Sequence, residues 1–501
     1  MRVTLVGHDY RYAVEQILLH TFPDQKPEFT DETASYTPSD TARAVVKLSR
    51  GGTRTTAVTT LTLGGTTYRA SAAALSQDLS DVERSRAERR LIQRSFFRAA
   101  KNVGKTDIPW GAAAGIRPST LVTKMLARGV SEAAAARTLE REYFVSPERV
   151  SLAIDCARAE FDARKLLQPH DIALYVGIPF CPTRCAYCTF VSNSVERSMA
   201  LIPPFLDSLH REIDALAGAI DGTGARVRTV YIGGGTPTTL TAAQLGELLA
   251  RLNGTFDLTH NLEFTVEAGR PDTIDAAKLR VMRDNGVTRV SVNPQTFDDD
   301  VLVAIGRRHT AEDTLRAYNL ARDAGFDALN MDLIAGLPTD TLDGFRRSLD
   351  RALELAPENI TVHSLSRKKG SRVTENTIAT PEGAIVQKMI GGGIAELRAS
   401  DYKPYYLYRQ KYSSGGLENT GWTQSGFECL YNIVMMDECA TVLSLGGGGV
   451  TKLVPKSGRI SRIFNPKYPY EYTDRIARLC EQKTEIRHYL EREFNDKSDS
   501  N

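Results

Sequence analysis

The chain has 501 residues, more than a single hydrophobic core usually organises, so we expect two to four domains. It carries 63 basic and 61 acidic side chains, for a formal net charge of +2, and 42% of its residues are hydrophobic. This balance is ordinary for a globular protein and argues against electrostatic binding of nucleic acid as the main function.

Neither a membrane span nor an export signal is expected from the sequence. No apolar run approaches the roughly 18 residues that a span needs, and the first residues, MRVTLVGHDYRY, are typical of a strand and a turn. We therefore expect a cytoplasmic protein. In that reducing compartment the seven cysteines are not expected to form a disulfide framework.

The N-terminal part of the chain divides into two regions of different periodicity. Residues 1–85 alternate apolar and polar positions, which predicts strands in RVTLVG, ARAVVKLSR and TTYRASAAA. Residues 86–168 carry helical periodicity instead, for example over Ala87–Val103. We expect an N-terminal α+β region of unknown role over 1–85 and a mainly helical linking region over 86–168.

A regular alternation of strands and helices begins at residue 169. Six β-rich runs are each followed by a segment with helical periodicity; they are ALYVGI, VRTVYI, LEFTVE, VTRVSV, ALNMDLI and NITVHSL. Such alternation predicts a parallel sheet, and six units are fewer than the eight of a closed TIM barrel. We predict an α/β fold with a partial (βα)6 TIM-like barrel over 169–384. Residues 385–501, rich in Tyr and Gly, are expected to form a C-terminal α+β extension.

Three cysteines directly after the first barrel strand are the strongest chemical signal. Cys181, Cys185 and Cys188 have the spacing C-x3-C-x2-C. Thiolates so spaced on one loop can bind three corners of an iron–sulfur cube and leave the fourth iron open. A structural zinc site would need a fourth ligand at customary spacing, which neither His170 nor His210 offers. The loop also follows the carboxyl end of a strand, where barrels place their chemistry.

Other polar or glycine-rich positions lie near the ends of the later strands. Consecutive glycines let a backbone approach a ligand closely, although a plain turn is the alternative. A carboxylate at a strand end can accept hydrogen bonds from a ligand, although it can also be a solvated residue at the edge of the sheet. An arginine can pair with an anionic ligand or, alternatively, with a buried aspartate. The positions are Gly233–Thr236, Glu267, Gln295, Arg307 and Asp332.

These motifs resemble a known family. The cysteine spacing, with an aromatic residue before the third cysteine, resembles the radical S-adenosylmethionine (SAM) superfamily. The motifs YVGIPFC, YIGGGTPT, NPQTF, IGRRHT and MDLIAGLP are similar to its oxygen-independent coproporphyrinogen III oxidase family. The resemblance implies a radical SAM barrel that binds a 4Fe–4S cluster and S-adenosyl-L-methionine.

The resemblance also implies the roles of individual residues. The cluster ligands would be Cys181, Cys185 and Cys188, with Tyr175 beside the cluster as a catalytic residue, although a core aromatic is the alternative for Tyr175. Arg307 would pair with the carboxylate of SAM and Asp332 would hold a ribose hydroxyl. The full set implied for the SAM site is Tyr175, Gly234, Gly235, Thr236, Glu267, Gln295, Arg307, Asp332 and Ser366.

The sequence departs from the family pattern at three places, so the resemblance defines the cofactors more firmly than the substrate. Gly177 stands where the family has a histidine, Phe190 stands where it has a fourth cysteine, and Asn293-Pro294-Gln295 replaces a more usual G-V-Q. The segments PWGAAAGIRP, NPQTF, YYLYRQKY, ENTGW and YNI resemble a longer branch of the family, named coproporphyrinogen dehydrogenase HemZ.

This resemblance implies an oxidoreductase of porphyrin and haem biosynthesis. It would decarboxylate the propionates of coproporphyrinogen III to vinyl groups without oxygen, giving protoporphyrinogen IX. An electron donor such as flavodoxin or ferredoxin would be its partner. Two alternatives remain open: a haem-binding chaperone that retains the cluster, and a radical SAM enzyme that acts on another tetrapyrrole.

Overall fold

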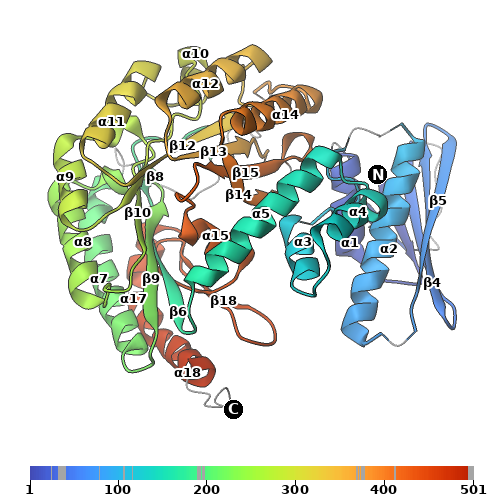
Figure 1. Cartoon of the computed structure of the whole chain (residues 1–501), viewed down its shortest axis with the longest axis horizontal. Coiled ribbons are helices and arrows are strands. Elements are labelled where there is room, and N and C mark those ends of the chain that lie inside the picture. Colours follow the sequence, from blue (N-terminus) through green and yellow to red (C-terminus); the bar gives the residue numbers. More distant parts are fainter. Residues whose placement is uncertain are drawn as a thin grey trace. The chain divides into compact units, whose positions relative to one another are not determined.

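The computed structural model describes residues 1–23, 25–31, 41–77, 79–104, 108–115, 117–188, 193–194, 198–367, 371, 373, 378–410 and 413–494 (Figure 1). Its contacts divide the chain into two compact units. The first unit comprises Met1–Ala157 and Tyr408–Glu418, and the second comprises Arg158–Leu407 and Asn419–Asn501. Within the described ranges, no helix has the length and apolar character needed to cross a membrane. The four regions expected from the sequence stay a prediction.

The first unit is built on a five-stranded sheet with the order β2-β1-β3-β4-β5. Strand β1 pairs in parallel with β2 and β3, whereas β3, β4 and β5 form an antiparallel meander. Alternate residues of β4 are buried, as expected for a strand with one face against a core. The strands are β1 (Arg2–Val6), β2 (Glu28–Thr30), β3 (Ala42–Arg50), β4 (Arg54–Leu63) and β5 (Thr66–Leu75).

Helices of the first unit close the core over this sheet. Helix α2 packs on β4 and β5, and its start is set by a capping box between Ser80 and Glu83. Val14, Ile92 and Phe96 are among the residues with no exposed surface in this core. The helices are α1 (Arg11–Thr21), α2 (Asp81–Asn102), α3 (Ser119–Leu126), α4 (Glu132–Tyr143) and α5 (Pro147–Leu166), the last of which continues into the second unit.

The second unit contains the predicted partial barrel. Six parallel strands lie side by side in the order β6-β9-β10-β11-β12-β13, which confirms the six strand-and-helix units expected from the sequence. Strand β6 is buried along nearly its whole length, as a sheet covered on both faces requires. The strands are β6 (Asp171–Ile178), β9 (Arg226–Gly234), β10 (Glu263–Glu267), β11 (Arg289–Ser291), β12 (Ala328–Ala335) and β13 (Asn359–Ser364).

Amphipathic helices cover the outer face of this sheet (Figure 1). In α12, Phe345, Leu349 and Ala352 are buried at helical spacing, while Thr341 caps the helix start by accepting from the Gly344 backbone N–H. The helices of this layer are α7 (Ile202–Ile220), α8 (Ala242–Thr255), α9 (Ala276–Asp284), α10 (Asp299–Ala304), α11 (Ala311–Asp323), α12 (Leu342–Leu355) and α14 (Gly383–Ala399).

The C-terminal part adds strands at both edges of the barrel sheet. Strand β15 pairs antiparallel with β13 and continues to β14, whereas β16 pairs in parallel with β6 and continues to β17 and β18. The elements are β14 (Lys403–Arg409), β15 (Glu418–Thr423), α15 (Leu430–Asp437), β16 (Thr441–Gly446), β17 (Val450–Leu453), β18 (Ser461–Phe464), α16 (Pro469–Asp474), α17 (Ile476–Glu481) and α18 (Lys483–Phe494). The resulting sheet has eleven strands in the part of the chain that the structure describes.

Candidate active site at the carboxyl ends of the barrel strands

The loop with the three cysteines is held against the glycine-rich end of β9. Backbone N–H groups of Gly235 and Thr236 donate to the carbonyls of Ile178 and Phe180, both at 2.7 Å. A Cβ atom at Gly235 would lie 2.4 Å from the Phe180 carbonyl oxygen, so this approach requires glycine. Thr236 Oγ1 then donates to Cys181 Sγ at 3.4 Å, which brings a predicted SAM residue to a predicted cluster ligand.

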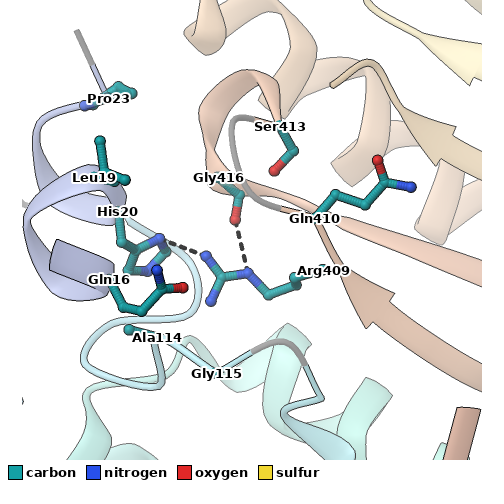
Figure 2. Close-up of a pocket in the computed structure, with 10 residues that line it drawn as sticks. All are labelled: Gln16, Leu19, His20, Pro23, Ala114, Gly115, Arg409, Gln410, Ser413 and Gly416. Atoms are coloured by element: carbon teal, nitrogen blue, oxygen red, sulfur yellow. Dashed lines mark hydrogen bonds between the residues drawn. The ribbon is translucent and has the colours of Figure 1, made fainter. Parts of the chain in front are cut away.

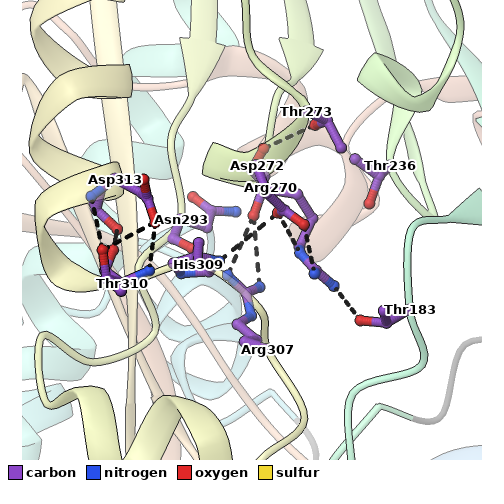
Figure 3. A network of polar contacts seen from close by, with 12 residues as sticks. Thr183, Thr236, Arg270, Asp272, Thr273, Asn293, Arg307, His309, Thr310 and Asp313 are labelled. Atoms are coloured by element: carbon purple, nitrogen blue, oxygen red, sulfur yellow. Dashed lines mark hydrogen bonds and ion pairs between the residues drawn. The ribbon is translucent and has the colours of Figure 1, made fainter.

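A buried arginine from the loop after β10 reaches the second cysteine. Figure 3 shows this arginine, Arg270, between Asp272 and Thr183. Arg270 Nη1 lies 3.6 Å from Cys185 Sγ and donates to Thr183 Oγ1 at 3.1 Å. Its Nε and Nη2 atoms donate to the two carboxylate oxygens of Asp272, each at 3.0 Å. Burial favours the neutral acid, but interactions with His309 and Arg270 hold the pKa of Asp272 well below its usual range. Arg270 therefore remains a compensated cation beside a cysteine sulfur.

A second buried arginine, Arg307, lies on the same side of the cysteine loop. Its Nη1 atom donates to the Asn293 carbonyl at 2.6 Å and its Nη2 atom donates to Tyr187 Oη at 3.2 Å. Burial opposes its charge, yet interactions with Tyr187 and Cys185 raise the pKa of Arg307 above its ordinary value. No carboxylate is among the hydrogen-bond partners of Arg307 in the described part of the chain, so it does not form the structural Arg–Asp pair that was one alternative.

Glu267, the last residue of β10, lies among stacked tyrosines. Tyr231 donates to Glu267 Oε1 at 2.7 Å, and the Tyr231 ring stacks on Tyr431 with centroids 4.4 Å apart. Tyr175 is 6.3 and 6.1 Å from these two rings. Burial raises the pKa of Glu267 to about 7, although the Tyr231 hydrogen bond acts in the opposite direction. This carboxyl group therefore changes its charge near neutral pH.

Asp332 lies within β12, three residues before the strand ends at Ala335, and contacts polar groups of its own strand and of β13. Asn330 Nδ2 donates to Asp332 Oδ1 at 2.8 Å, and His363 Nε2 from β13 lies 3.6 Å from Asp332 Oδ2. Burial would raise the pKa of Asp332, but interactions with His363 and Asn330 hold it below its ordinary value. The carboxylate is thus ionised and half-buried.

Two amide side chains between β11 and α10 have buried oxygens without a hydrogen-bond partner. They are Asn293 Oδ1 and Gln295 Oε1, and Gln295 also has a left-handed backbone with φ of 69°. Unpaired buried acceptors and a strained backbone are common where a ligand completes the structure. Gln295 lies four residues after the end of β11 rather than at the strand end.

The structure adds less about Ser366, Phe190 and the C-terminal tyrosines. Ser366 is half-buried two residues beyond β13. Phe190, which stands where the family has a fourth cysteine, lies outside the described residues. In the Tyr-rich C-terminal part, Tyr405 and Tyr406 are buried at 1% and 5% exposure.

Arg270, three residues beyond β10, belongs to none of the motifs, and no role was expected for Tyr231 although it opens the motif YIGGGTPT. Tyr231 lies on β9, one strand away from Glu267. The sequence left two interpretations of His363 open, a core histidine or a catalytic base, and the structure places its Nε2 3.6 Å from Asp332 Oδ2. The signal that could have pointed to Arg270 is its position just beyond a strand end.

The residues present fit a cubane cluster and SAM. Three thiols lie within eight residues, one of them 3.6 Å from a guanidinium that favours an anionic ligand set. The glycines of β9 leave backbone open for close approach, and the orphan oxygens of Asn293 and Gln295 supply acceptors. Within the described ranges no three His, Cys, Asp or Glu side chains converge on one metal ion. A cubane poses a different requirement, because each cysteine binds its own iron.

Comparisons with known proteins identify the same barrel. The family model of the radical SAM superfamily matches residues 175–352. The oxygen-independent coproporphyrinogen-III oxidase-like protein HemZ of Bacillus subtilis is 38% identical over 393 residues, which cover 77% of each chain. The heme chaperone HemW of Haemophilus influenzae is 28% identical over 304 residues, covering 60% of this chain and 75% of that protein.

A solved structure agrees with this assignment at the level of the fold. Coproporphyrinogen III oxidase (HemN) from Escherichia coli, described as a radical SAM enzyme, superimposes with a TM-score of 0.51 at 23% identity. The match covers 64% of this chain and 73% of that chain. The chain therefore belongs to the radical SAM superfamily, whose cofactors are a 4Fe–4S cluster and S-adenosylmethionine, and within it to the family of oxygen-independent coproporphyrinogen III oxidase-like proteins.

Proposed function

We propose that the protein is a radical SAM enzyme that decarboxylates propionate side chains of coproporphyrinogen III to vinyl groups. The observation that carries the proposal is the gathering of charged groups from β10, β12 and the loop after β11 at the end of the barrel where the three thiols lie. Cys181, Cys185 and Cys188 would each hold one iron of the cluster.

Each part of SAM has a matching group in this site. Glu267 would accept hydrogen bonds from the amino group, and the Gly234–Thr236 backbone would lie along the amino-acid part. Arg307 would pair with the carboxylate, since none of its hydrogen bonds goes to an acid among the described residues. Asp332 would hold ribose hydroxyls, while Gln295, Ser366 and Tyr175 would line the same space.

The two cofactors, when bound, supply one-electron cleavage of a sulfonium and hence a radical able to take a hydrogen atom from the substrate. The chain's own residues orient the reacting groups and exclude water. The stacked rings of Tyr175, Tyr231 and Tyr431 form an apolar wall beside Glu267. For each propionate, removal of one hydrogen atom, one CO2 and one electron leaves a vinyl group, so an electron acceptor is also required.

The tetrapyrrole substrate is supported by charge and by the relatives. Three exposed arginines lie on loops of the barrel: Arg184 beyond β6, Arg308 between α10 and α11, and Arg367 beyond β13. Cations on these loops suit a substrate with several propionates. The name of the Bacillus subtilis relative, a coproporphyrinogen-III oxidase-like protein, agrees with this substrate class.

A second candidate is delivery of haem rather than turnover of a porphyrinogen. It is favoured by the absence of a cysteine at Phe190 and by relatives named heme chaperones. A third is radical chemistry on another tetrapyrrole.

An anaerobic assay separates these functions. The reconstituted and reduced protein would be incubated with SAM and coproporphyrinogen III, and CO2, methionine and the porphyrin products would be quantified. We expect one CO2 for each vinyl group formed, and hence two for each molecule of protoporphyrinogen IX. Methionine release without vinyl product would overturn the proposed substrate, and stoichiometric haem binding without SAM cleavage would establish the chaperone function instead.

A further inference from the structure

A small cavity in the first unit has no part in the chemistry described above (Figure 2). It lies between α1, the loop around Ala114 and the segment 408–418, all of which belong to this unit. Its volume is about 50 Å³. The residues that line it are Gln16, Leu19, His20, Pro23, Ala114, Gly115, Arg409, Gln410, Ser413 and Gly416.

The cavity contains a buried guanidinium whose hydrogen bonds all go to neutral groups. Arg409 is 7% exposed. Its Nε donates to the Gly416 carbonyl at 3.0 Å, its Nη1 donates to the Ala113 carbonyl at 2.8 Å, and its Nη2 lies 2.6 Å from His20 Nδ1. A guanidinium has five N–H groups, so these three contacts leave further donors on Arg409.

No acid among the described residues is hydrogen-bonded directly to Arg409. Burial and the charge of Arg409 hold the pKa of His20 well below its ordinary value, so the imidazole is neutral and accepts from the guanidinium. Glu418 is the acid that acts on Arg409, but its oxygens accept from Trp110 Nε1 at 2.6 Å and from Arg149 Nε at 3.0 Å. Burial lowers the pKa of Arg409 to about 10, which still leaves it charged at neutral pH.

A second donor near this cation also lacks a partner. Gln16 Nε2 is buried and has no hydrogen-bond partner among the described residues. Figure 2 shows the Gln16 amide and the His20 ring next to the Arg409 guanidinium. An unpaired buried donor costs about 1–3 kcal/mol, and an isolated buried charge costs more. The Arg409 cation and the unpaired Gln16 amide donor, which line the same cavity, together favour binding of an anion there.

We propose that this cavity binds a small oxyanion, a carboxylate or phosphate group, between Arg409 and Gln16. Arginine binds such groups through paired N–H donors, and Gln410 and Ser413 add polar groups to the lining. Since one water molecule occupies about 30 Å³ of liquid, the cavity suits an ion of a few heavy atoms rather than a larger metabolite.

The test uses the full chain with its cluster reconstituted under anaerobic conditions. Its Tm would be measured in rising sodium phosphate and sodium acetate, each against sodium chloride of equal ionic strength. We expect a saturable rise of about 3 °C with at least one oxyanion at roughly ten times its Kd. A response to phosphate alone assigns a phosphate group, and a response to acetate alone assigns a carboxylate.

Three variants make the result specific. In Gln16→Leu the orphan donor is removed, so the Tm without oxyanion should stay the same or rise, whereas the oxyanion Kd should increase about tenfold. Arg409→Gln should abolish the response, and Arg90→Gln, which removes an exposed charge from α2, should keep it. If neither ion raises the Tm beyond chloride, or if Gln16→Leu responds as the parent does, the proposal is overturned.

Discussion

Arg270 in the barrel and Arg409 in the first unit are both buried, with exposures of 3% and 7%, but they have different partners. Arg270 makes two hydrogen bonds to the Asp272 carboxylate and then approaches a cysteine sulfur. Arg409 bonds two backbone carbonyls and a neutral histidine. In the barrel the chain itself balances the cation, whereas in the first unit the balance is left to a ligand.

This difference separates positioning from binding. A compensated cation can be held rigidly beside a cluster ligand without requiring a further anion, so Arg270 acts as a positioning residue for the Cys185 loop. An uncompensated cation gains stability when an anion arrives. The barrel site with Arg270 and the cavity with Arg409 can be tested separately, beginning with the cluster ligands.

The largest effect is expected from Cys185→Ala. Each thiolate holds one iron, so loss of one ligand should abolish both the charge-transfer absorption of the reconstituted cluster and reductive cleavage of SAM. The oxyanion response of the first unit should persist, because that unit has its own core. Cys480→Ala is the matched control, since Cys480 is half-buried and outside the cysteine loop. Survival of the cluster absorption in Cys185→Ala would refute the ligand assignment.

Replacing the acid that balances Arg270 should make that arginine resemble Arg409. Asp272→Asn leaves a buried guanidinium without a carboxylate, and we expect about 2 kcal/mol lower free energy of unfolding at pH 7. Because the pKa of Asp272 is held below its usual range, its stabilisation is present above pH 4 or so and is lost as the pH falls further. Urea unfolding at pH 7 and pH 3 should therefore show a gap between parent and variant that narrows in acid. An equal gap at both pH values would contradict the assigned ion pair.

The barrel could be predicted because its signals are local and periodic. Strand-like runs alternate with amphipathic helices such as α7 and α12. The C-terminal strands could not be assigned to the barrel sheet in the same way. That β16 pairs in parallel with β6 depends on contacts between segments more than 260 residues apart, which no local pattern records.

Within the site, motif residues were predictable and their supporting groups were not. Cys181, Cys185 and Cys188 stand out by spacing alone, whereas Arg270 has no such signal until the fold brings it to Cys185. Arg409 was visible only as part of a Tyr-rich segment. Its lack of a carboxylate partner is a property of the packed core and not of the sequence around it.

Glu267 is the opposite of Arg409: it is a buried acid that is proposed to bind the amino group of SAM. Its pKa of about 7 means that the carboxylate needed to bind an amine is only partly formed below neutral pH. SAM affinity should therefore rise about fivefold between pH 6 and pH 7, about twofold more by pH 8, and then level off. Glu267→Gln should bind more weakly at pH 8 and lose this slope. Equilibrium binding of SAM to the reconstituted protein from pH 5.5 to 8.5 measures both, and an unchanged slope in the variant would exclude Glu267 as the titrating group.

The smallest expected effect concerns the hydroxyl that supports Glu267. Tyr231 donates to Glu267 Oε1 at 2.7 Å and so favours the ionised carboxylate. Tyr231→Phe keeps the ring stacked on Tyr431 but removes this donor, which is worth about 0.5–1.5 kcal/mol. The midpoint of the pH dependence of SAM binding should move upward by up to about one pH unit, while affinity at pH 8.5 changes little. Tyr431→Phe is the control, since its ring belongs to the same stack and its hydroxyl has no hydrogen-bond partner among the described residues. A uniform loss of affinity at every pH in Tyr231→Phe would instead assign Tyr231 to packing alone.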